Sequence, residues 1–189
     1  MPDDIHNYEK VSNYPLDPEK QEELLNTHRE CVFNWCTQDN WPMGVIMSYI
    51  WMDGRVWLTA GAHRHRISAV RRNPKVSVVL SSASAGRGPG QTLTVQGRAV
   101  LHEDQETKDW FYPALAYKGL QGAAAEDFVK RLDSPLRVII EVVPEKWITF
   151  DGGKMALDTA GTLTDEQKGP MLESDRVRLQ RELERRGIS

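Results

Sequence analysis

Apolar and polar residues alternate along several short stretches of the chain, and this period of two residues is typical of β-strands. The pattern is clearest over 91–101, where one face is formed by Leu93, Val95, Ala99 and Leu101. Runs rich in β-branched and aromatic residues extend the prediction to other segments. The further strands are expected at 30–37, 44–52, 55–59, 76–81 and 136–143, with 146–150 continuing the last one.

Helical spacing and helix-start signals mark other ordered segments. Asp17 and Pro18 are a suitable N-cap and first residue for a helix that ends near residue 29. Other helices are expected at 67–72, 103–118 and 123–132. The charges of 164–189 recur at helical i,i+4 spacing and predict an exposed helix, whereas the glycine-rich segment after Asp151 is expected to be a loop.

The order of these elements favours antiparallel strands. Asp53-Gly54 is a strong hairpin signal, because both residues tolerate positive φ. Short strands at hairpin spacing predict a mainly β barrel or sandwich and not a parallel sheet. The chain is expected to divide into an extended N-terminal segment (1–17), a β-domain with helices (18–150), and a loop with a charged C-terminal helix (151–189).

Composition places the chain among globular proteins. Its 189 residues are 40% hydrophobic and 27% charged, values that suit one domain with a core and argue against disorder. No apolar run approaches the roughly 20 residues of a membrane helix, and the acidic, polar N-terminus is unlike a secretory signal. A cytoplasmic protein without a membrane partner is expected.

Cys31 and Cys36 suit neither a zinc ribbon nor a disulfide scaffold, so two free thiols are expected.

Charge is distributed unevenly along the chain. The net charge is −3, from 24 basic and 27 acidic residues, yet segment 54–102 contains basic residues and no acid. Such a basic island in an acidic chain predicts a local site for an anion. A nucleic-acid-binding domain typically has a pI above about 9. This sequence has a pI of about 6.0, so nucleic acid is not the expected partner.

The basic residues after strand 55–59 have the types and order of a phosphate site. Thr59 offers a hydroxyl, Arg64 and Arg66 offer planar guanidinium forks, and the helix that follows offers free N–H groups. His65 can donate from either ring nitrogen. Arg71 and Arg72 lie at the far end of that helix, where cations suit the dipole. His63 and His65 lack a third metal ligand, so no metal site is expected.

At this point the chain resembles a known family. The pattern is DGRVWLT, a short loop with Arg-His-Arg, then AVRRNPKVSVVL, and a long strand ending in QGRA. It is similar to the flavin-binding split-barrel proteins related to pyridoxamine 5′-phosphate oxidase, over about 30–150. The resemblance implies a six-stranded antiparallel split β-barrel with flanking helices. It also implies a homodimer with flavin mononucleotide (FMN) in clefts between the subunits.

The resemblance also implies which residues bind the cofactor. The phosphate would be held at the end of the third strand and in the loop that follows it, by Leu58, Thr59, Arg64, His65 and Arg66. The flavin ring would lie against Val45, Ile46, Met47, Ser48, Gln91 and Thr92. Trp147 would either cover the ring by stacking or belong to the core.

Departures from the oxidase bear on the substrate. His65 replaces a lysine, Gln91-Thr92 replaces an Arg-Gln pair, and the terminal arginine-rich substrate motif is absent. These differences indicate another small-molecule substrate. The expected activity is a flavin-dependent oxidoreductase, with hydride transfer between FMN and an organic substrate or a nicotinamide, and no catalytic acid or base is assigned. A deazaflavin in place of FMN stays open, as does a non-enzymatic flavin- or haem-binding protein with His63 or His65 as the axial ligand.

Overall fold

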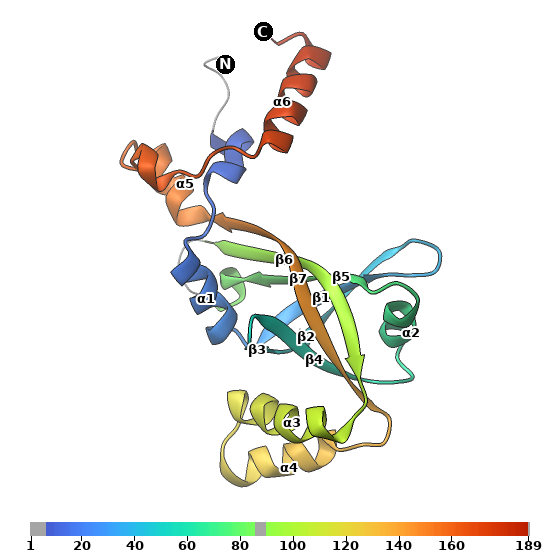
Figure 1. The fold of residues 1–189 in the computed structure, drawn as a ribbon. Helices are drawn as coiled ribbons and strands as arrows, with labels where there is room; N and C mark the ends of the chain where they lie inside the picture. The colour runs from blue at the N-terminus through green and yellow to red at the C-terminus, as the bar shows by residue number, and fades with distance from the viewer. Residues whose placement is uncertain (1–6, 86–89, 189) are drawn as a thin grey trace. The chain divides into compact units, whose positions relative to one another are not determined.

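The computed structural model describes residues 7–85 and 90–188, which contain seven strands and six α-helices (Figure 1). The strands are β1 (Glu30–Cys36), β2 (Pro42–Ser48), β3 (Ile50–Met52), β4 (Arg55–Gly61), β5 (Lys75–Ser81), β6 (Gln91–His102) and β7 (Arg137–Asp151). The helices are α1 (Pro18–Thr27), α2 (His65–Arg72), α3 (Gln105–Gly119), α4 (Gly122–Leu132), α5 (Gly152–Thr159) and α6 (Glu173–Arg186). Short 3-10 helices are η1 (Asn7–Asn13), η2 (Ser82–Ala85) and η3 (Asp165–Gln167).

The fold is mixed α/β, and the expectation of a mainly β fold is wrong. Helices of all types hold 44% of the described residues. The strands form one curled antiparallel sheet with the order β2-β1-β5-β6-β7-β4-β3, so the sheet has seven strands and not six. No helix among the described residues is long and apolar enough to cross a membrane.

The additional strand arises at Tyr49, where the predicted strand 44–52 divides in two. The Tyr49 side chain is fully buried, and its hydroxyl donates to Leu25 O at 2.7 Å. Its backbone N–H donates to Arg29 O at 3.3 Å, outside the sheet ladders. The chain therefore leaves β2, which pairs with β1, and enters β3, which pairs with β4. Because β2 and β3 are the two edges of the sheet and only Tyr49 separates them, the sheet must curl toward closure.

The chain forms two compact units. The sheet unit comprises 22–80 and 94–147, and the terminal unit comprises 1–21, 81–93 and 148–189. Strands β6 and β7 run from one unit into the other. The three-part division expected from the sequence stays a prediction.

Inward-facing strand residues and two helices build the core of the sheet unit. Burial alternates along β1, β4 and β5, as a half-buried strand requires. Helices α3 and α4 lie side by side and bring Phe111, Tyr112 and Leu115 against Ile50 and Ile139 (Figure 1). This packing secures the first half of β7, which begins at the candidate site described below.

Polar contacts hold the terminal unit together. Buried Asp151 accepts hydrogen bonds from the Gly153 and Lys154 amides and caps α5. The glycines after Asp151 therefore begin a helix, and the predicted loop is wrong. The segment expected to be extended, 1–17, contains η1, while its first six residues lie outside the described part. The exposed charged helix expected near the C-terminus is confirmed as α6, in which no residue is buried.

Candidate functional site

The sheet unit contains a pocket of about 210 Å³ that has no acidic residue in its lining. It lies where β4 ends, α2 begins and β7 begins. Its lining comprises Thr59, Ala60, Gly61, His63, Arg64, Arg66, Ser134, Leu136 and Arg137. Three arginines and no acid in a cavity of this size make it strongly electropositive.

Strand pairing brings these distant segments together. Strand β4 runs antiparallel to β7 with Gly61 opposite Arg137, so the end of one strand meets the start of the other. Beyond the ladder, the Ala62 amide donates to Leu136 O at 2.6 Å. The Arg64 amide donates to Gly61 O at 2.9 Å and closes the turn that leads into α2. The pocket walls are therefore fixed by backbone hydrogen bonds.

Helix α2 begins at the pocket without a side-chain cap. Its N-cap is Arg64, whose side chain makes no capping hydrogen bond. The amides of His65 and Arg66 find no acceptor among the residues the structure describes. Free N–H groups at a helix start carry partial positive charge and favour an anion there.

The guanidinium groups of the pocket have no acidic partner in the part of the chain that the structure describes. Neither Arg64 nor Arg66 pairs with an acid within residues 7–85 and 90–188. The Nε atoms of Arg66 and Arg137 are both buried and have no hydrogen-bond acceptor. Burial lowers the pKa of the Arg66 guanidinium, and the nearby charge of Arg64 lowers it further. Buried donors and mutually repelling cations are the arrangement that an oxyanion would satisfy.

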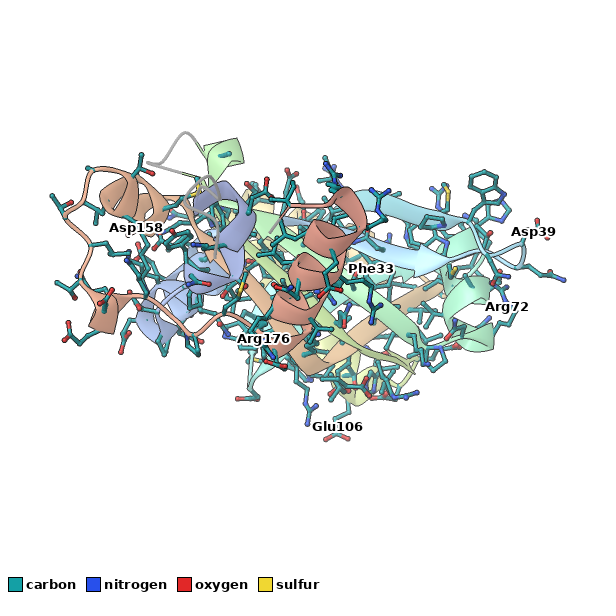
Figure 2. All side chains as sticks on the ribbon, turned by 90° about the horizontal axis from the view of Figure 1, so that it is seen from above. Phe33, Asp39, Arg72, Glu106, Asp158 and Arg176 are labelled. Atoms are coloured by element: carbon teal, nitrogen blue, oxygen red, sulfur yellow. The ribbon has the colours of Figure 1, made fainter. Side chains whose placement is uncertain are left out.

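Most other arginines of the basic island make structural contacts elsewhere. The salt bridges are Arg55–Glu141 at 2.8 Å, Arg71–Glu103 at 2.7 Å and Arg98–Glu145 at 2.6 Å. Arg72, in the last turn of α2, donates to Cys36 O at 2.9 Å beside the loop that carries Asp39 (Figure 2). Among the arginines of the island that the structure describes, this leaves Arg64 and Arg66, which both line the pocket.

The structure brings together three of the residues expected to hold a phosphate. Thr59, Arg64 and Arg66 all line the pocket. Thr59 Oγ1 donates to Val138 O at 2.8 Å, so its oxygen is fixed in position and its proton is already in use. Leu58 is fully buried in the core, and the exposed His65 lies outside the lining.

The residues expected around a flavin ring lie on other elements. In β2, Ile46 and Ser48 are exposed, Val45 is half-buried and Met47 is buried. In the terminal unit, the Gln91 side-chain Nε2 donates to Asp151 Oδ2 at 3.2 Å. Thr92 follows it and is half-buried. Trp147 is half-buried and packs edge-on against Trp51 with ring centroids 5.8 Å apart. Their contact with a ring stays a prediction.

Sequence reasoning missed Arg137 and Ser134 as members of the pocket, and it considered His63 only as a haem or metal ligand. Arg137 lies far from the basic island in sequence, so a search for clustered charge does not find it. The available signal was its place at the start of the most hydrophobic strand, which the antiparallel pairing with β4 brings to the basic loop. His63 enters the pocket because Gly61 leaves room. A Cβ at Gly61 would lie 2.8 Å from the His63 ring.

The chain belongs to the pyridoxamine 5′-phosphate oxidase family, whose model matches residues 17–151. The match spans most of the sheet unit and includes every β-strand. The resemblance seen in the sequence is thereby confirmed. No curated protein matches the chain significantly.

Solved structures share the split-barrel fold at low sequence identity. The conserved hypothetical protein Rv2991 from Mycobacterium tuberculosis has a TM-score of 0.67 and 20% identity, covering 77% of this chain and 91% of that one. An F420 reductase has a TM-score of 0.53 and 21% identity, with coverages of 67% and 94%. The haem storage protein HutZ from Vibrio cholerae has a TM-score of 0.58 and 12% identity, with coverages of 72% and 96%. At these identities the likeness establishes the fold alone.

Proposed function

We propose that this protein is an FMN-dependent oxidoreductase whose pocket binds the terminal phosphate of the cofactor. One observation carries the proposal. The pocket gathers three guanidinium groups and the free start of a helix, without a carboxylate. Two of its buried Nε donors have no acceptor among the residues that the structure describes, and phosphate oxygens would supply acceptors.

Each pocket residue has a definite part in this proposal. Arg64 and Arg66 donate to phosphate oxygens, and the amides at the start of α2 add neutral donors. Thr59 holds the end of β4 to β7 through its bond to Val138, so it shapes the wall. The cofactor, when bound, supplies hydride transfer with a small organic substrate or a nicotinamide.

We further propose that the protein works as a homodimer. Strand β2 is an edge of the sheet, and it exposes large apolar side chains, with Ile46 70% and Met43 44% exposed. Unpaired edges with exposed apolar residues are typical of surfaces that pair with another chain. The exposed side chains of Ile46 and Ser48 would then face the cleft between subunits, and Val45 and Met47 would contribute their backbone to its wall. Gln91, Thr92 and Trp147 are assigned to the ring by family resemblance.

The pocket favours a nucleotide cofactor over haem. A haem site needs an axial ligand and an apolar cleft for the flat macrocycle. His63 lies here among guanidinium groups in a cavity of about 210 Å³, which suits a phosphate better. A deazaflavin also carries a phosphate, so it is the nearest competing cofactor.

Native mass spectrometry with a visible spectrum of the purified full chain tests the proposal. We expect the mass of a dimer with one FMN per chain, and the absorption of a flavin. Replacing Arg64 by Gln should abolish retention of FMN. Arg98→Gln, which changes an exposed arginine bonded to Glu145, is the matched control and should retain it. A colourless protein that takes up neither FMN nor a deazaflavin on reconstitution would refute the proposal, and a Soret band would favour haem.

A further inference from the structure

Arg137 lies at the pocket although it comes from a different part of the chain. It is the first residue of β7 and pairs with Gly61, the last residue of β4. Its own amide donates to Ser134 O at 2.9 Å, which closes the turn before the strand. The pairing with β4 and the bond to Ser134 therefore hold the Arg137 backbone in place, and its side chain forms part of the pocket lining.

The contacts of the Arg137 side chain do not explain its burial. Its Nε is buried without an acceptor, and no acid among the described residues forms a salt bridge with it. The Tyr112 hydroxyl is also buried, with no hydrogen-bond partner among the described residues. Burial raises the pKa of that hydroxyl, and the nearby charge of Arg137 offsets part of the rise. A buried donor without a partner is costly, so a residue of purely structural role would be expected to have one.

We propose that Arg137 is a third phosphate ligand, and that it makes the pocket selective for a doubly charged terminal phosphate. Arg64, Arg66 and Arg137 converge on one cavity without an acid to balance them. A phosphate monoester carries close to two negative charges at neutral pH, whereas a phosphodiester carries one and riboflavin none. The monoester therefore offsets the repulsion among the three cations best. This inference rests on the proposed function in taking FMN as its physiological ligand.

Flavins that share the ring but differ in their phosphate separate phosphate binding from ring binding. Dissociation constants are measured for FMN, riboflavin and FAD. In FAD each of the two phosphates has one ester bond and one anhydride bond, so each carries a single negative charge and neither is a free terminal phosphate. Wild-type protein should bind FMN most tightly. Arg137→Gln should weaken FMN binding roughly tenfold to a hundredfold, as expected for one lost charge-assisted bond, and leave riboflavin binding unchanged. Arg137→Lys keeps the charge but loses the planar fork, so it should fall between the two.

Two control variants test for a structural role. Arg131→Gln removes an exposed arginine near the end of α4, outside the pocket lining, and should leave the preference for FMN unchanged. Tyr112→Phe removes the hydroxyl near Arg137 without changing the lining, and should also retain the preference. Equal weakening of FMN and riboflavin in Arg137→Gln would overturn the proposal, because it would indicate a general loss of structure.

Inorganic phosphate, followed by calorimetry, separates this inference from the proposed function. One outcome is that the wild type binds phosphate but no flavin, while Arg137→Gln binds phosphate at least tenfold more weakly. In that case the flavin assignment is wrong, and the assignment of Arg137 as a phosphate ligand is supported. If Arg137→Gln binds phosphate and FMN as tightly as the wild type, Arg137 is not a ligand although the proposed function survives. If the wild type binds neither FMN nor phosphate, both are wrong.

Discussion

Replacing Arg66 by Met should stabilise the cofactor-free protein while weakening its binding of FMN. Methionine keeps an unbranched apolar stem of similar length and removes the guanidinium. In the structure that guanidinium has a buried, unpartnered Nε and feels the charge of Arg64. The variant therefore removes a group that costs free energy in the empty pocket and that becomes useful only when an anion is present.

The magnitude follows from the two states of the pocket. A buried donor without a partner costs about 1–3 kcal/mol, and the lower end applies because Arg66 is only half-buried. We therefore expect a gain of about 1 kcal/mol in the free energy of unfolding, or about 2–4 °C in Tm for a chain of this length. Loss of the phosphate contact should weaken FMN binding roughly tenfold to a hundredfold.

Thermal unfolding with and without FMN measures both effects together. At a concentration of 100 times the wild-type Kd, FMN adds about 2.7 kcal/mol to wild-type stability. If the variant binds a hundredfold more weakly, the same FMN adds only about 0.4 kcal/mol to it. The order of the two melting temperatures should therefore reverse when FMN is added. A variant that is less stable without cofactor, or that FMN stabilises as much as the wild type, refutes the reasoning.

Two further predictions concern the scaffold. Gly97→Ala should lower the free energy of unfolding by about 1–3 kcal/mol in urea titrations, because its Cβ would lie 2.3 Å from Val143 O. The control is Gly90→Ala, whose Cβ would meet nothing within 4 Å among the described residues and which should leave the free energy of unfolding unchanged. Equal effects of the two substitutions would contradict the close approach at Gly97. In the terminal unit, burial raises the pKa of Asp151, but hydrogen bonds from Lys20 and the Gly153 and Lys154 amides outweigh it and set the pKa below the usual value. The stability that this carboxylate contributes should be present above about pH 4 and lost as the pH falls through the lowered pKa. Asp151→Asn should therefore flatten the acid limb of a plot of Tm against pH. An unchanged acid limb would show that the contacts of Asp151 contribute little to stability.

Local patterns in the sequence predicted the elements that local physics determines. Alternation identified β6, and runs of β-branched and aromatic residues identified β1 and β5; the structure shows alternating burial along β1 and β5. The turn at Asp53-Gly54 was also predicted correctly, and the two residues have φ of 53° and 71°. The sequence also indicated part of the pocket lining, because Arg64 and Arg66 lie within a few residues of Thr59 and all three line the pocket.

The features that sequence reasoning missed depend on tertiary contacts. The break at Tyr49 follows from a hydroxyl that reaches Leu25 and an amide that bonds Arg29, and no local propensity indicates either contact. Helix α5 forms because the Asp151 side chain caps it, although two glycines follow. Arg137 joins the pocket only through the pairing of β4 with β7, which connects residues far apart in sequence.

The most direct measurement is a crystal structure of the protein with FMN. We expect the phosphate oxygens of FMN to lie within hydrogen-bonding distance of the Arg64 and Arg66 guanidinium groups, at the start of α2. Phosphate density at any other place, with both guanidinium groups left facing solvent, would contradict the central claim.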